Sequence, residues 1–238
     1  MNTESNRHTY LFAGIMVITI AFVLSFTSES LKELKLDNVK KEKMQNILST
    51  VGVNVSRDES EDLYNQYIIE ELSLTHNGDI DQEVNAFNIN LALEIRKGLD
   101  DQRFPLYIAD VDNSKYYIIP LRGNGLWNAI WGYIALKQDI NTIEGISFGH
   151  EAETAGLGAE ITQDWFMNSF NDEKILNSNG EFVGIYVSKS NNDPDNIDKN
   201  DNEVDAISGA TITGDGVSDM IKERLENYLP YFNNLSNE

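Results

Sequence analysis

Three hydroxyl side chains gather in residues 205–216, which read Asp-Ala-Ile-Ser-Gly-Ala-Thr-Ile-Thr-Gly-Asp-Gly. They belong to Ser208, Thr211 and Thr213, and the glycine and alanine between the first two let another molecule approach the backbone. The segment leads into an amphipathic helix expected at 216–229. Because the free N–H groups and the dipole at the start of a helix favour an anion, these residues predict a phosphate group held near Thr211.

The helix expected at 216–229 also offers a simpler explanation of the hydroxyls. We expect the Gly-Asp-Gly run 214–216 to mark its start and Pro230 to end it. Its apolar residues recur at three- and four-residue spacings and predict packing on a sheet: Val217, Met220, Ile221, Leu225, Tyr228 and Leu229. Composition alone favours ordinary capping of this helix by Thr213 or Asp215 over a ligand site.

A resemblance to a known family favours the ligand site over helix capping. The segment Asp205-x-x-Ser208-Gly209-Ala210-Thr211 resembles the flavinylation motif of the FMN-binding domain family, in which a flavin transferase moves FMN from FAD onto the last threonine. The small residues before that threonine leave its hydroxyl unhindered for bonding to phosphorus. The resemblance implies a covalent FMN, linked through a phosphoester to Thr211.

Two further segments resemble the family formed by the C subunits of Na+-translocating NADH:quinone reductases. Pro120-Leu-Arg-Gly-Asn-Gly-Leu-Trp127 is similar to the glycine loop of that family. Gly145-Ile-Ser-Phe followed by Glu153-Thr-Ala-Gly-Leu-Gly158 is similar to its second loop, where Ala155 replaces the usual proline and is expected to loosen the loop without removing a functional group. The order and spacing of the three segments agree with the family, as does a single N-terminal span, so the resemblance covers nearly the whole chain.

The two loops and the threonine motif together give the residues expected to hold the flavin. Their glycines permit close approach to a flat, largely apolar ring, Trp127 and Leu157 are expected near that ring, and polar side chains are expected at its edges or at the ribityl and phosphate groups. The expected cofactor-binding residues are Arg122, Asn124, Gly125, Trp127, Glu153, Thr154, Gly156, Leu157, Gly158, Asp205, Ser208, Gly209, Ala210, Thr211 and Thr213. A surface salt bridge is an equally good interpretation of Arg122, and core packing is the preferred one of Trp131.

Charge and composition exclude several classes of function. The formal net charge is −21, from 18 Lys plus Arg against 39 Asp plus Glu, which sets nucleic-acid binding aside because the chain would be repelled by phosphate backbones. The sequence contains no cysteine, which excludes disulfides, thiolate nucleophiles and cysteine-ligated metal centres. The histidines His8, His76 and His150 form no visible cluster. We therefore expect no metal site and no catalytic side chain, and redox chemistry would need an organic cofactor.

An uncharged apolar stretch runs from Tyr10 to Thr27. At 1.5 Å per residue it reaches about 27 Å, near the hydrocarbon thickness of a bilayer. A cleaved signal peptide is the alternative, but no small-x-small cleavage site follows, so we predict an uncleaved anchor. Lysines after the span favour a cytoplasmic domain by the positive-inside rule, whereas the resemblance implies a periplasmic domain on the bacterial inner membrane. We follow the resemblance, because a long exported domain and the mixed charges of residues 29–43 weaken the rule.

The remaining patterns predict an α+β fold: a twisted mixed sheet with flanking helices, preceded by one N-terminal transmembrane helix. We expect the anchor at 1–28, a helical stalk at 29–50 and an FMN-binding domain at 51–238, with its core at 104–230.

Within the domain, helical spacing predicts an acidic amphipathic helix at 57–71 and a short helix at 163–170. Short apolar runs predict the strands Leu106–Ala109, Lys115–Leu121, Trp131–Leu136, Gly145–Phe148 and Glu181–Val187. The Asn/Asp-rich residues 188–204 are expected to form a mobile surface loop. Their spacing resembles that of an EF-hand loop, but we do not predict a metal site, because Glu203 occupies the position where that loop needs glycine.

The resemblance implies that the chain is one component of a respiratory sodium pump. Electrons would reach its FMN and continue to a second covalent FMN on the B subunit and to quinone, while sodium crosses the membrane. Its partners would be subunits A, B, D, E and F, together with the flavin transferase during maturation. The G subunit of a ferredoxin:NAD oxidoreductase complex is the nearest alternative, and a membrane-tethered binding or scaffold domain without flavin is the alternative from another class.

Overall fold

The computed structural model describes residues 6–193 and 196–235, and the chain divides into two compact units between Lys43 and Met44. Helix α1 spans Asn6–Ser30 and helix α2 spans Lys32–Ser49, so the residues of α2 from Met44 onward belong to the second unit. A turn at Leu31 separates the two helices. The helix expected in the predicted stalk is confirmed as α2.

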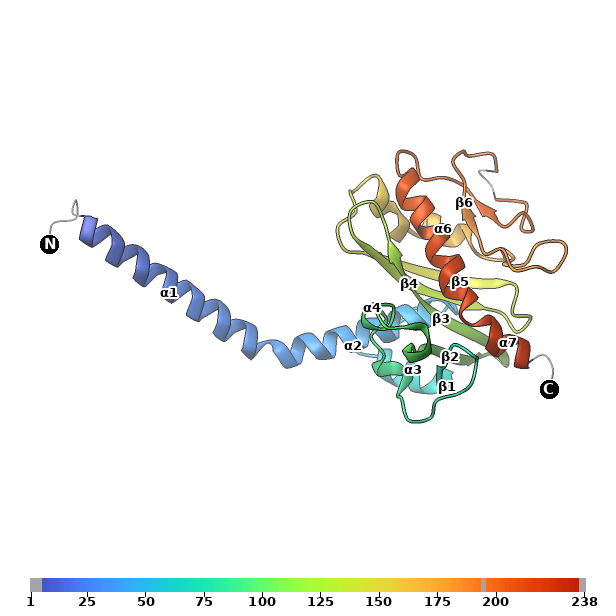
Figure 1. Cartoon of the computed structure of the whole chain (residues 1–238), viewed down its shortest axis with the longest axis horizontal. Coiled ribbons are helices and arrows are strands. Elements are labelled where there is room, and N and C mark those ends of the chain that lie inside the picture. Colours follow the sequence, from blue (N-terminus) through green and yellow to red (C-terminus); the bar gives the residue numbers. More distant parts are fainter. Residues whose placement is uncertain (1–5, 194–195, 236–238) are drawn as a thin grey trace. The chain divides into compact units, whose positions relative to one another are not determined.

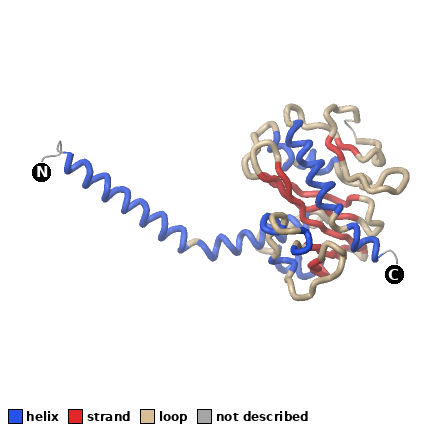
Figure 2. Tube along the Cα trace, in the orientation of Figure 1, coloured by secondary structure: helices blue, strands red, loops and turns tan. Residues whose placement is uncertain are grey.

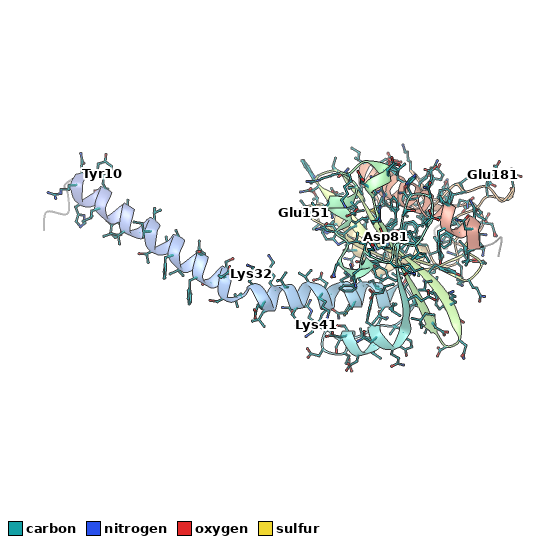
Figure 3. The ribbon with its side chains drawn as sticks, turned by 60° about the horizontal axis from the view of Figure 1, so that its bottom comes forward. Tyr10, Lys32, Lys41, Asp81, Glu151 and Glu181 are labelled. Carbon is teal, nitrogen blue, oxygen red and sulfur yellow. The ribbon has the colours of Figure 1, made fainter. Side chains whose placement is uncertain are left out.

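Helix α1 is apolar, and none of its residues is buried. Figure 3 shows its side chains standing out from the ribbon along its length, as at the labelled Tyr10. Its length and its mean hydropathy of 2.2 satisfy the requirements of a membrane span, which confirms the apolar helix expected at Tyr10–Thr27. A secretory signal satisfies the same requirements, so the uncleaved anchor stays a prediction.

The second unit is built on one five-stranded sheet with the strand order β1-β2-β3-β4-β5 (Figure 2). The strands are β1 Ile68–Leu74, β2 Phe104–Val111, β3 Ser114–Asn124, β4 Ala129–Leu136 and β5 Ile143–His150. Every neighbouring pair is antiparallel. Asp112 and Asn113 join β2 to β3, both with positive φ, in the type of two-residue turn whose twist suits a hairpin. Four of the predicted strands are therefore confirmed as β2 to β5, each longer than predicted.

Helices and a second, small sheet complete the unit. The α-helices are α3 Ser60–Tyr67, α4 Leu91–Glu94, α5 Asp164–Ser169, α6 Thr211–Glu226 and α7 Leu229–Leu235. The 3-10 helices are η1 Ala86–Asn88, η2 Leu99–Asp101 and η3 Gly158–Thr162. Strands β6 (Tyr186–Val187) and β7 (Glu203–Val204) pair in parallel in a separate sheet. The α+β class is confirmed, but the expected mixed sheet is not: the large sheet is entirely antiparallel, and the parallel pair of β6 and β7 lies in the small separate sheet.

Alternating side chains place a hydrophobic cluster on each face of the large sheet. On one face Ile119 of β3 belongs to the same cluster as Met220 of α6, and α6 lies across the sheet in Figure 1. On the other face Ile118 belongs to a cluster with Ile47 and Leu48, near the end of α2. A residue of β3 that points away from α6 therefore points toward the face covered by the end of α2.

Helix α6 begins at Thr211, earlier than the Gly-Asp-Gly run predicted to start it. The two glycines lie inside the helix because they let it approach its neighbours closely. A Cβ atom at Gly216 would lie 2.2 Å from the carbonyl oxygen of Asn124, and one at Gly214 would lie 3.0 Å from Cγ1 of Val187. The predicted start was wrong because these glycines serve packing and not a turn.

Other predicted boundaries also differ. Pro230 does not end α6; it lies in the first turn of α7, where its missing N–H leaves no helix hydrogen bond unmade. The helix predicted at 57–71 stops at Tyr67, because the next residues pair with β2 as strand β1. The strand predicted at Glu181–Val187 reduces to β6.

Candidate functional site

Thr211 is the first residue of α6, and its side chain is exposed. The preceding Ala210 provides no side-chain cap, and the N–H of Gly214 donates to the carbonyl of Ala210 as the first turn closes. The N–H groups of Thr211 and the residues directly after it therefore stand at the start of a 16-residue helix, where an anion is favoured. This chemistry fits a phosphate ester on the Thr211 hydroxyl.

The two residues expected to cap α6 have other partners. Thr213 is buried, and its hydroxyl donates a hydrogen bond of 2.7 Å to Oε2 of Glu153. Asp215 forms an ion pair of 3.5 Å with Lys189. Capping by Thr213 or Asp215 was therefore the wrong explanation of the hydroxyls.

Glu153 joins the first glycine loop to the start of α6. Its side chain is buried, with 7% exposed, although it lies in a surface loop. Oε1 accepts a hydrogen bond of 2.9 Å from the backbone N–H of Trp127, while Oε2 accepts the one from Thr213. Both carboxylate oxygens are thus used inside the protein, so this side chain holds three segments of the site together instead of reaching toward a ligand.

Two of the expected glycines make room for this carboxylate. A Cβ atom at Gly125 would lie 2.5 Å from Oε1 of Glu153. One at Gly158 would lie 2.2 Å from Oε2 and 2.5 Å from the hydroxyl oxygen of Thr213. Any larger residue at either position would displace Glu153, so the spacing of the glycines follows from the buried carboxylate.

The second loop also touches the threonine motif directly. Gly209 has a φ of +74°, and a Cβ atom there would lie 2.8 Å from Cδ2 of Leu157. Gly156 has a φ of +76°, and its N–H donates to the side chain of Glu160. Glycine at 156 is therefore favoured by the turn alone, whereas glycine at 209 is favoured by the turn and by the close approach of Leu157.

The side chains around Thr211 are mostly exposed. Thr154 and Ser208 are exposed, and the carbonyl of Thr154 accepts hydrogen bonds from the N–H groups that close the second loop. Trp127 is 67% exposed and Leu157 is 41% exposed, as expected for residues that would flank a ligand. The segments predicted to form one site are thus brought together around an open surface beside Thr211.

Sequence reasoning missed two exposed apolar residues in these segments. Leu126, next to Trp127, is 47% exposed, and Ile212, next to Thr211, is 58% exposed. A start of α6 at residue 216 would have left Ile212 in a loop, so its place in the first helical turn could not be seen. The signal that could have revealed it is a large apolar residue directly after Thr211.

Arg122 is not brought to this surface. Gly123 faces α6, since a Cβ atom there would lie 2.7 Å from Cβ of Met220. Neighbouring residues of a strand point to opposite faces, so the Arg122 side chain lies on the other face of β3, where its pairing partner on β4 is Trp131. Asn124 takes part through its backbone, because its carbonyl oxygen is the atom that approaches Gly216.

Asp205 anchors the Asn/Asp-rich residues 188–204 to the threonine motif. Its Oδ1 accepts hydrogen bonds from the backbone N–H groups of Asn192 at 3.1 Å and Asp193 at 3.4 Å. Of this segment, Pro194 and Asp195 lie outside the described residues. The role of Asp205 seen in the structure is therefore to hold this segment.

The same segment is fastened at a second place by a buried carboxylate. Glu173 is fully buried, and Nζ of Lys199 lies 3.3 Å from its Oε1. Burial raises the pKa of Glu173 to about 7, against the opposing effect of Lys199. Lys199 also donates to the carbonyl of Ser169, and the side-chain amide of Asn202 donates to the carbonyl of Lys174.

Comparison with known proteins gives consistent results. The FMN-binding domain family matches residues 125–226, which include the second loop and the threonine motif. The C subunit of the Na(+)-translocating NADH-quinone reductase of Haemophilus ducreyi is 28% identical over 228 residues, covering 89% of this chain and 84% of that protein.

Two solved structures share the fold. The C subunit of the Na(+)-translocating NADH-quinone reductase from Parabacteroides distasonis is 37% identical, with a TM-score of 0.75, covering 84% of this chain and 96% of that one. Shewanella oneidensis NqrC, at 24% identity and a TM-score of 0.69, covers 84% of this chain and 99% of that one and shows the shared fold alone. The sequence match to the Parabacteroides protein over nearly its whole length means that this chain belongs to the family of C subunits of Na(+)-translocating NADH-quinone reductases.

Proposed function

We propose that this chain carries one FMN in a phosphoester to Thr211 and relays electrons within a membrane-bound NADH-quinone reductase. The observation that carries the proposal is the exposed Thr211 hydroxyl at the uncapped start of α6, beside two glycine loops that Glu153 joins to the same helix. The match to the FMN-binding domain family supports the cofactor.

The phosphate would be held mainly by backbone groups. The first-turn N–H groups of α6 would donate to its oxygens, and the exposed hydroxyl of Ser208 lies three positions before Thr211 in the chain. Gly209 and Ala210 leave the approach to Thr211 unobstructed, while Trp127 and Leu157 would flank the ring. Arg122 is left out of this proposal, because its side chain lies on the opposite face of β3.

The attachment is a group transfer from FAD. The bond that forms joins the Thr211 hydroxyl oxygen to the phosphorus of the FMN half, and the bond that breaks is the pyrophosphate link. AMP leaves, and the hydroxyl proton is transferred to the leaving phosphate. The flavin transferase would supply FAD and the catalytic groups, which agrees with the lack of any general base in hydrogen-bond contact with Thr211 among the described residues.

Bound FMN supplies reversible electron acceptance and donation, and the protein supplies orientation and a fixed position. A covalent link keeps the local concentration of the cofactor high whatever the level of free FMN. The buried Glu153 carboxylate fixes the glycine loops relative to Thr211, so the flavin would be presented at a constant place on the surface.

The proposed setting is a multi-subunit complex in the bacterial inner membrane. Its other members would be subunits A, B, D, E and F, with electrons passing to the B-subunit flavin and quinone while sodium is exported. Residues 1–28 would anchor the chain, 29–50 would form the stalk, and 51–238 would form the FMN-binding domain in the periplasm. Support comes from the names of the relatives and from the apolar helix α1. Membership of the C-subunit family decides against the G subunit of a ferredoxin:NAD oxidoreductase.

The attachment is tested by producing the full chain in cells that also make the flavin transferase. After denaturing electrophoresis, in-gel flavin fluorescence is expected for the wild type and for Ser208→Ala, and its complete loss is expected for Thr211→Ala. Thr211→Ser keeps a hydroxyl at the same place and should retain part of the signal. Fluorescence that persists in Thr211→Ala contradicts the linkage, and a flavin-free wild type would favour a scaffold domain.

A further inference from the structure

Four large apolar residues in the segments that meet near Thr211 are exposed, and we call them the apolar rim: Leu126, Trp127, Leu157 and Ile212. Their exposed fractions range from 41% to 67%. They come from three distant segments that meet, because Glu153 accepts hydrogen bonds from the Trp127 N–H and the Thr213 hydroxyl and because a Cβ atom at Gly209 would lie 2.8 Å from Cδ2 of Leu157. Large exposed apolar residues gathered in neighbouring segments are typical of an interaction site.

The segments that carry the apolar rim are strongly acidic. Segments 122–128, 150–165 and 205–219 contain a single Lys or Arg, namely Arg122, whose side chain lies on the other face of the sheet. The acidic residues of the same segments are Glu151, Glu153, Glu160, Asp164, Asp205, Asp215 and Asp219. Glu153 is buried and Asp215 is paired with Lys189, whereas Glu151, Asp164 and Asp219 are exposed, so these three carboxylates form the acidic border of the rim.

We propose that the apolar rim and its acidic border are the docking surface for a protein that exchanges electrons with this chain, and that the partner's docking face has an apolar centre bordered by Lys and Arg. The inference rests on the proposed function, because the electron must enter and leave beside Thr211. Complementary charge orients such an encounter, and a small apolar centre suits a contact that is made and broken repeatedly.

Charge decides between the occupants that this surface could take. A second copy of the chain would bring an identical acidic border against the first, and like charges across an interface repel. Anionic lipid headgroups would be repelled for the same reason. The flavin would rest against Trp127 and Leu157, which leaves Leu126 and Ile212 for the partner. A protein with a basic docking face is the occupant that satisfies these conditions.

The test uses the assembled complex in native membranes, with variants that change only side chains to which the proposed flavin site gives no role. Leu126→Ser combined with Ile212→Ser removes the apolar centre. The matched control is Ile197→Ser, since Ile197 is 79% exposed and lies outside the three segments. Flavin content is read from in-gel fluorescence, the flavin midpoint potential from redox titration, and electron transfer from the rate at which NADH reduces this flavin.

The double variant is expected to lower the rate about tenfold, the size of effect that truncating central interface residues produces, with content and potential unchanged. An unchanged rate overturns the docking surface. Loss of fluorescence or a shifted potential assigns both residues to the flavin and overturns docking while the proposed function stands. A wild-type complex without fluorescence overturns both proposals.

The sign of the charge is tested separately on the purified, flavin-loaded full chain. Its reduced flavin is oxidised either by hexaammineruthenium(III), a cation, or by ferricyanide, an anion. Raising the salt concentration should slow the first reaction and accelerate the second, since salt screens both attraction and repulsion. In Figure 3 Glu151 and Glu181 lie at opposite sides of the domain, so Glu181→Lys is the matched control for Glu151→Lys combined with Asp164→Lys. The double variant should weaken both salt effects, and the control should leave them unchanged. A control that weakens them as much as the double variant does would overturn the proposal.

Discussion

The hydroxyl of Thr213 donates a hydrogen bond of 2.7 Å to the buried carboxylate of Glu153. The bond joins the first turn of α6 to a loop that lies far away in the sequence. Because the other oxygen of the same carboxylate accepts a hydrogen bond from the N–H of Trp127, the first glycine loop is fixed to the helix as well. Thr211 lies two positions before Thr213, so its orientation depends on this arrangement.

Removing the Glu153 carboxylate should destabilise the second unit. Glu153→Ala leaves the buried Thr213 hydroxyl and the Trp127 N–H without an acceptor, and we expect a loss of about 2–4 kcal/mol in the free energy of unfolding. Glu153→Gln keeps one acceptor oxygen and should lose about 1 kcal/mol. Urea denaturation of the full chain measures both values. Equal stability of Glu153→Ala and wild type would mean that the two hydrogen bonds contribute nothing.

Two glycines of the second loop should differ in their tolerance of alanine. At Gly158 a Cβ atom would overlap Oε2 of Glu153 and the Thr213 hydroxyl, so Gly158→Ala should cost about 3 kcal/mol and reduce flavin attachment. At Gly156 nothing lies within 4 Å of a Cβ atom. Gly156→Ala should therefore cost only about 1 kcal/mol, because alanine is disfavoured at the positive φ of this residue. Denaturation midpoints and in-gel fluorescence compare the two variants. The explanation from steric overlap fails if Gly156→Ala is the more damaging change.

Glu173 should make the stability of the protein depend on pH. Burial raises the pKa of Glu173 in the folded state from 4.5 to about 7. The folded state therefore holds this proton more tightly, and the contribution to stability is complete below pH 4.5 and is lost as pH rises to about 7. The loss should be roughly 3 kcal/mol and should stop above that range.

The pH dependence is isolated by substitution. Glu173→Gln cannot ionise, so the difference between its unfolding free energy and that of the wild type should grow between pH 4.5 and 7. Glu181→Gln is the matched control, because the Glu181 side chain is exposed. A difference that stays constant over this range would show that Glu173 does not titrate there.

The strands were predictable because the sheet has a simple pattern. The apolar runs that became β2 to β5 lie in the middle of the sheet or under helices, and burial of their side chains leaves a strong signal in the sequence. Strand β1 was missed because it is an edge strand with three exposed residues at Ile69, Glu70 and Glu71, and its first residues continue the helical spacing of α3. Its identity as a strand depends on pairing with β2, which local sequence does not reveal.

The site was predictable as a set of segments but not as a set of contacts. The motif and the two loops lie together in the structure as expected, while the partners of individual side chains depend on tertiary packing. Gly216 was interpreted as part of a turn. Glycine is needed there because the carbonyl oxygen of Asn124 packs against it, and Asn124 is distant in the chain. Arg122 was counted with the site because the sequence does not show which face of the strand carries its side chain. That face is fixed by the packing of Gly123 against Met220.

The central claim is a covalent bond at one oxygen atom, and peptide mapping by tandem mass spectrometry tests it most directly. Trypsin cleaves after Lys199 and Lys222, so the single peptide 200–222 contains Ser208, Thr211 and Thr213. For the full chain produced together with the flavin transferase, we predict that this peptide gains the mass of FMN less one water and that fragment ions assign the gain to Thr211. An unmodified peptide, or a modification that the fragments assign to Ser208 or Thr213, would contradict the account.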